Sequence, residues 1–84
     1  MYYVTSTYRY TINPDEKPLR FIVKCESLTE MQLTQNYFLT NPDYKNVTLL
    51  TKKPYYSKSR YQVRYVSFED MEKTIYNYFD LIMN

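Results

Sequence analysis

The stretch Arg60-Tyr61-Gln62-Val63-Arg64-Tyr65-Val66-Ser67-Phe68-Glu69-Asp70-Met71 decides the fold predicted for this chain of 84 residues. In its first half, apolar or aromatic side chains alternate with polar ones, which is typical of a strand that buries one face. Ser67 followed three residues later by Asp70 is the pattern of a helix cap, so the strand is expected to lead directly into a helix. On this strand we expect the inward side chains to be Tyr61, Val63 and Tyr65, and the outward ones to be Arg60, Gln62 and Arg64.

A weaker copy of this stretch lies forty positions earlier, in residues 20–31. Residues 20–34 and 60–74 are identical at five of fifteen aligned positions, including both cap serines. Unrelated segments of ordinary composition would match at roughly one. We therefore interpret the chain as a single domain, residues 1–84, built from two related units at about 1–41 and 42–84.

The predicted order of elements is two strands, a helix, two strands and a helix. Alternation and turn residues place the strands at 2–12, 19–26, 46–53 and 60–66, and the helices at 28–40 and 68–83. The first helix is expected to bury Leu28, Met31, Phe38 and Leu39, and the second Phe68, Met71, Ile75, Tyr78, Phe79 and Ile82. Because one such unit cannot bury its own apolar faces, the prediction is an α+β fold. Its two ββα units would form a four-stranded antiparallel sheet, with both helices packed on one face.

The composition argues against catalysis. The chain has no His and no Gly, so it lacks the usual general base and any glycine-rich phosphate loop. Cys25, the one cysteine, falls on the predicted core face, where it is interpreted as a small buried side chain. We expect no catalytic residue, metal or cofactor, and therefore a protein that is not an enzyme.

The sequence also suggests a compartment. A lone cysteine fits a reducing environment, and residues 1–12 alternate without the apolar core of a signal peptide. No apolar run is long enough to cross a membrane, so we expect a cytoplasmic protein without membrane contact. The chain uses many Tyr, Asn, Lys and Ile residues, whose codons are AT-rich, and has no Gly or Ala, whose codons are GC-rich. This composition indicates an AT-rich genome, such as that of a bacteriophage or mobile element.

Positive charge is concentrated in one part of the chain. No acidic residue lies between Asp43 and Glu69, whereas six of the eleven Lys and Arg residues do, interleaved with tyrosines. Cations neutralise phosphates and aromatic rings stack on bases, so this pattern favours nucleic acid or a nucleic-acid-associated complex as partner. The candidate binding residues are Arg20, Lys24, Lys52, Lys53, Tyr55, Tyr56, Lys58, Arg60, Gln62 and Arg64.

Two other functions fit the same surface. Tyr and Arg are enriched at the energetic centres of protein interfaces, so the chain is also interpreted as an accessory or inhibitory protein that binds a host protein. The third possibility is a homodimer with a structural role. An exposed antiparallel sheet that merely tolerates Arg, Lys and Thr would produce the same pattern without any ligand.

Overall fold

The computed structural model of the chain describes residues 1–11 and 14–83, leaving aside the side chains at 79, 82 and 83. Ile12, predicted to end the first strand, and the side chains of Phe79 and Ile82 lie outside these described parts. The elements follow one another as β1 (Tyr2–Tyr8), β2 (Leu19–Cys25), α1 (Leu28–Thr40), β3 (Tyr44–Leu50), β4 (Gln62–Ser67) and α2 (Phe68–Met83).

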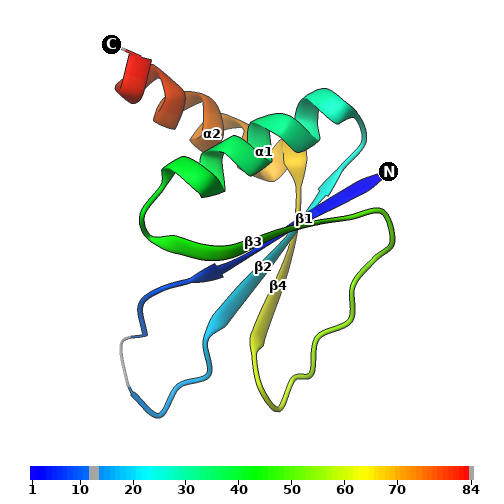
Figure 1. Cartoon of the computed structure of the whole chain (residues 1–84), viewed down its shortest axis with the longest axis vertical. Coiled ribbons are helices and arrows are strands. Elements are labelled where there is room, and N and C mark those ends of the chain that lie inside the picture. The colour runs from blue at the N-terminus through cyan, green and yellow to red at the C-terminus, as the bar shows by residue number, and fades with distance from the viewer. Residues whose placement is uncertain (12–13, 84) are drawn as a thin grey trace.

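The predicted α+β class is confirmed, but the sheet is mixed and not antiparallel throughout. Its strand order is β3-β1-β2-β4. Strand β1 runs antiparallel to both β2 and β3, whereas β2 and β4 are parallel. The two strands of the first predicted unit, β1 and β2, therefore pair as an antiparallel hairpin. Those of the second unit, β3 and β4, lie at opposite edges and do not pair (Figure 1). The sheet is not built from two equivalent hairpins.

The connection between β3 and β4 explains this arrangement. These two strands run in the same direction, so the chain must return along the sheet and cross two strands before β4 begins. Strand spacings and lengths make that path about 25 Å. The connection, residues 51–61, has eleven residues, which reach about 36 Å when extended. A parallel arrangement is thus within reach, and the chain must pass over one face of the sheet.

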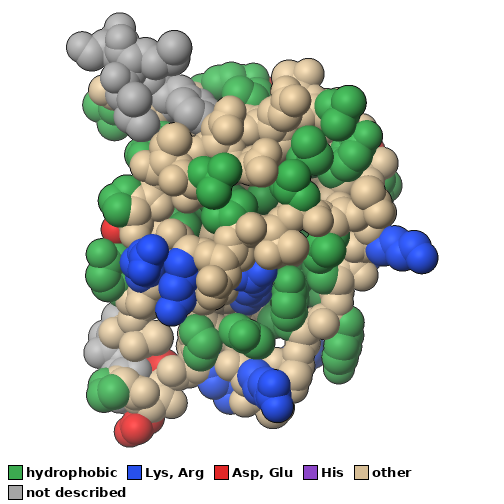
Figure 2. All heavy atoms as spheres, viewed as in Figure 1, with side chains coloured by type: hydrophobic (Ala, Val, Ile, Leu, Met, Phe, Trp, Pro, Cys, Tyr) green, Lys and Arg blue, Asp and Glu red, His purple; other side chains and the backbone are tan. Residues whose placement is uncertain are grey.

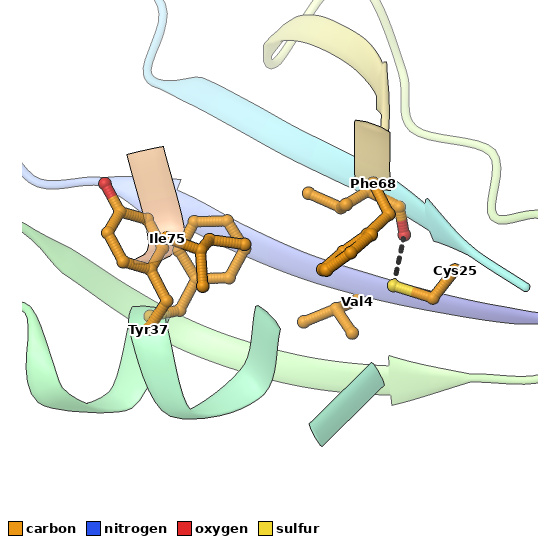
Figure 3. Packing of buried hydrophobic residues seen from close by; sticks show 7 residues of the cluster. Val4, Cys25, Tyr37, Phe68 and Ile75 are labelled. Atoms are coloured by element: carbon orange, nitrogen blue, oxygen red, sulfur yellow. Dashed lines mark hydrogen bonds between the residues drawn. The ribbon is translucent and has the colours of Figure 1, made fainter. Parts of the chain in front are cut away.

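Both helices cover the other face and form the main core with it. Val4, Val23 and Cys25 point from the two central strands toward the helices and have no exposed area. Phe68, the first residue of α2, lies against Val4 and Cys25 (Figure 3). Further along α2, Ile75 lies beside Tyr37 of α1 in the same view.

Helix α1 is rotated relative to the predicted face. Phe38 is buried as predicted and Tyr37 is buried beside it, whereas two other residues expected inside, Leu28 and Leu39, are 55% and 61% exposed. The cause is the second helix, because the ring of Tyr37 meets that of Tyr78 edge-on at 5.1 Å. Packing against a neighbouring helix therefore overrode the apolar pattern of α1 itself.

Both predicted helix caps are confirmed. The Oγ of Ser27 accepts a hydrogen bond from the Glu30 amide at 3.2 Å, and that of Ser67 accepts one from the Asp70 amide at 3.2 Å. The Glu30 carboxylate also accepts a hydrogen bond from the amide of Glu26, the residue before the cap, at 3.0 Å. These contacts satisfy amides that would have no partner at the helix starts.

The alternation predicted for β4 is inverted. Val66 pairs with Val23 and packs against the core, so Gln62 and Arg64 lie on the helix-covered side of this edge strand. Val63 and Tyr65 take the opposite face, beside Arg20 and Ile22. Arg60 and Tyr61 precede the strand. The prediction that Arg60, Gln62 and Arg64 form an outward row is therefore wrong.

Candidate functional site

The sheet face away from the helices is the surface that the sequence predicted to be open. Residues 51–61 instead cross it, and the central strands beneath are closed to solvent. Thr5 and Ile22, which point away from the helices, are 0% and 1% exposed. The central sheet therefore has a second buried layer, on the face that the long β3–β4 connection crosses.

Arg20 lies inside this layer and is not free to bind phosphate. It is 6% exposed, and its guanidinium donates to Thr7 Oγ1 and Thr5 Oγ1 at 2.6 Å each. It also donates to the carbonyl of Asn46 at 2.8 Å. Asn46 has a positive φ of 54° at an irregularity in the β1–β3 pairing, a backbone conformation that Asn tolerates better than most residues. Neutral oxygen atoms of the neighbouring strands thus accept the hydrogen bonds of the buried Arg20 guanidinium.

Tyr56 is the contact between this buried arginine and the connection. The Arg20 guanidinium lies 5.2 Å from the centre of the Tyr56 ring, within the range of a cation–π interaction. The Tyr56 hydroxyl donates to Thr5 Oγ1 at 3.3 Å and accepts from Arg20 at 3.4 Å. The structure therefore uses both Arg20 and Tyr56 to hold residues 51–61 on the sheet, which corrects their predicted exposure.

Other candidates on the connection do face solvent. Tyr55 is 87% exposed. The cationic residues of this segment are exposed as well: Lys52, Lys53, Lys58 and Arg60. We call these five residues the basic loop. A side chain from the β1–β2 connection holds the base of this loop, since the carbonyl of Lys58 accepts a hydrogen bond from Lys17 Nζ at 2.7 Å.

A cleft of about 340 Å³ opens beside the basic loop, on the same face of the sheet. Of the predicted residues it brings together Lys24 from β2 and Lys53 from the loop. The residues that sequence reasoning missed come from three strands, and the full lining is Tyr3, Ile22, Lys24, Lys53, Tyr65, Val66 and Ser67. We call this set the lysine cleft. The sequence prediction placed Tyr65 in the core, because it assigned the two faces of β4 the wrong way round. No local feature of the sequence therefore identified Tyr65 as a cleft residue.

The lysine cleft has an apolar floor and a cationic rim. Ile22 and Tyr3 are 1% and 9% exposed. Lys53 Nζ lies 4.7 Å from the centre of the Tyr65 ring, and Lys24 Nζ lies 3.9 Å from Glu26. The described lining contains no carboxylate. The cleft therefore suits a ligand with a flat apolar part and a negative charge.

The last two predicted residues lie apart from this cleft. Gln62 donates from its side-chain amide to the carbonyl of Lys17 at 3.1 Å, at the start of β4. Arg64 is exposed on the helix-covered side of the sheet. Figure 2 shows the Lys and Arg side chains in several separate groups on the side of the molecule that faces the viewer. The part of the surface seen in that view therefore has no continuous basic patch.

Cys25 has the properties of a core residue. It is fully buried, and burial raises the pKa of its thiol, an effect that the hydrogen bond with Thr34 partly opposes. A thiolate nucleophile is disfavoured under these conditions. Within residues 1–11 and 14–83, no helix is both long and apolar enough to cross a membrane.

Comparison with known proteins adds no family to this description. The chain matches no protein-family profile, no curated protein and no solved structure. Function must therefore be argued from the basic loop and the lysine cleft.

Proposed function

We propose that the protein acts by binding and without catalysis, and that it engages nucleic acid through the basic loop and the adjoining lysine cleft. The observation that supports this most directly is the exposed loop itself. Its four cations flank Tyr55 in the sequence, and the Tyr55 side chain is 87% exposed. No acid occurs in the sequence between Asp43 and Glu69.

The physical basis is the pairing of charge with an accessible ring. Lysine and arginine neutralise backbone phosphates and release counterions, whatever the base sequence. An exposed tyrosine offers a platform on which a base can stack. Four predicted residues lie outside this proposal. Arg20 is buried and Tyr56 is half-buried against it. The side chain of Gln62 is bonded to Lys17, and Arg64 lies on the helix-covered side of the sheet.

A salt titration tests the proposal. A fluorescein-labelled single-stranded 20-mer is titrated with protein at several salt concentrations from about 50 mM upward, and binding is followed by anisotropy. The double variant Lys52→Ala/Lys58→Ala should weaken binding and lower the slope of log K against log salt by about 1.4, which is two phosphate contacts. Lys73→Ala, an exposed lysine on α2, is the matched control and should change neither.

Absence of binding by the unmodified protein at 50 mM salt would rule out this function.

The second candidate, a protein partner, rests on the exposure of Tyr55 alone, because exposed tyrosines commonly anchor interfaces. It predicts that Tyr55→Ala abolishes capture of a defined partner, whereas the two lysine substitutions weaken it only modestly.

A further inference from the structure

We infer that the lysine cleft binds one unpaired nucleotide, with the base over the apolar floor and the phosphate between Lys24 and Lys53. This inference rests on the proposed function and deepens it, because it predicts selectivity for single strands over duplexes. The basic loop by itself would not discriminate between them.

The size and lining of the cleft support a ligand of this class. Its volume, about 340 Å³, is at the small end of the range for small-molecule sites. Such sites combine an apolar surface with a few polar groups that fix orientation. Here the accessible apolar surface is the ring of Tyr65, which is 50% exposed, with the nearly buried Ile22 and Tyr3 in the floor.

The two lysines provide charge complementarity for a phosphate. They approach the cleft from different segments, Lys24 from β2 and Lys53 from the basic loop. Lys24 is engaged with Glu26 at 3.9 Å, but the two side chains are 47% and 66% exposed. Exposed pairs of this kind contribute little, so a phosphate can replace the carboxylate.

Acidic residues define which end of the cleft the phosphate must avoid. A neighbouring depression shares Lys24 and Ser67 with the lysine cleft and is also lined by Glu26, Glu30 and Glu69. A phosphate placed toward Lys53 keeps away from these carboxylates. Glu26 therefore opposes binding in two ways, since it repels the anion and competes for Lys24.

The recessed floor explains the selectivity. Bases within a duplex are stacked and paired, and only their edges are accessible in the grooves. A base can enter a cleft only when it leaves the stack, at a cost that is smallest for a strand that is already single. A single strand therefore satisfies both the loop and the cleft, whereas a duplex satisfies the loop alone.

The experiment compares three probes with four proteins. The probes are a fluorescein-labelled dT20 strand, a blunt 20-base-pair duplex, and free dTMP measured by calorimetry. The proteins are the unmodified chain, Lys24→Ala, Glu26→Gln and the control Lys73→Ala. Lys24 in the cleft and Glu26 beside it are both exposed, and circular dichroism verifies that each variant is folded.

We expect dT20 to bind at least about tenfold more tightly than the duplex. Lys24→Ala should weaken dT20 binding about tenfold and remove most of the preference, because it deletes one charged contact to the phosphate. Glu26→Gln should strengthen dT20 binding about threefold, the size expected when an exposed ion pair is released. A merely structural role for Glu26 would not produce tighter binding.

The possible failures are distinguishable. Equal binding of dT20 and duplex, both sensitive to Lys52→Ala/Lys58→Ala, would overturn the cleft inference and leave the proposed function standing. No binding of either probe would overturn the proposed function. If dTMP alone then bound, and Lys24→Ala abolished it, the cleft would still hold a nucleotide, taken from free solution.

Discussion

Replacement of Arg20 by Met tests whether this arginine is a structural cation or a surface ligand. Met keeps much of the side-chain length but removes every donor. Thr5 Oγ1 retains its contact with Tyr56 at 3.3 Å, whereas the carbonyl of Asn46 and the hydroxyl of Thr7 lose the bonds of 2.8 and 2.6 Å that Arg20 made.

The expected cost follows from these two acceptors. A buried polar group left without its partner costs about 1–3 kcal/mol. Met also avoids the desolvation of a guanidinium, so we expect a net loss of about 3 kcal/mol in the free energy of unfolding. A chain of this length has roughly 4–12 kcal/mol in total. The melting temperature should fall by about 15 °C.

Urea denaturation followed by far-ultraviolet circular dichroism measures this loss. Arg60→Met is the matched control, because Arg60 is exposed in the turn before β4, and it should change stability by less than about 0.5 kcal/mol. Arg20→Lys should fall between the two, since an ammonium cannot reproduce the forked geometry of a guanidinium.

One result would refute the reasoning. If Arg20→Met cost no more than Arg60→Met but reduced oligonucleotide binding, Arg20 would be accessible and residues 51–61 would not cover the sheet. If Arg20→Met instead lowers the stability, and the folded variant binds the oligonucleotide as tightly as the unmodified protein does, the buried position of Arg20 is supported.

Three further predictions concern the helix-side core and its border. Burial, reinforced by Tyr37, raises the pKa of Tyr44, so its contribution to stability is complete below the unfolded pKa near 10 and is lost as pH rises above it. Urea midpoints should therefore decline from pH 9 to 11, less steeply in Tyr44→Phe; equal slopes would contradict this. Cys25 should resist a thiol reagent in the native protein and react promptly in urea, and rapid native modification would show that the core opens. Ser27→Ala should cost about 1 kcal/mol through its lost bond to the Glu30 amide, whereas Ser27→Asp should keep the cap; equal stability of the two would deny the cap a role.

The helix starts were predictable because their signals are local. A cap joins a side chain to an amide three residues away, so Ser27 and Ser67 could be identified without knowing what surrounds them. The β1–β2 hairpin was predictable for a related reason, since a short polar segment leaves antiparallel pairing as the simplest arrangement.

The orientation of β4 was not predictable in this way. Alternation separates the side chains of a strand into two sets but does not say which set meets the helices. Both sets here include apolar residues, because Val66 packs in the main core while Tyr65 lies toward the connection, where its hydroxyl donates to the carbonyl of Pro54 at 3.3 Å. Choosing between them required the position of residues 51–61.

The candidate site shows the same division. Charge and tyrosine content identified residues 52–60 as a basic segment, and those cations are exposed. Their neighbours in space were not identifiable, because the parallel pairing of β2 with β4, which brings Tyr65 beside Ile22, was not predicted.

The sequence by itself determined the α+β class, the two capped helices and the concentration of positive charge before β4. Each of these depends on composition or on contacts a few residues apart. Only the tertiary structure decided that β4 pairs parallel to β2, that Arg20 is buried, and that Lys24 and Lys53 share a cleft. The physical reason is that one connection crosses the sheet, and the side chains it covers are fixed by contacts between residues far apart in the chain.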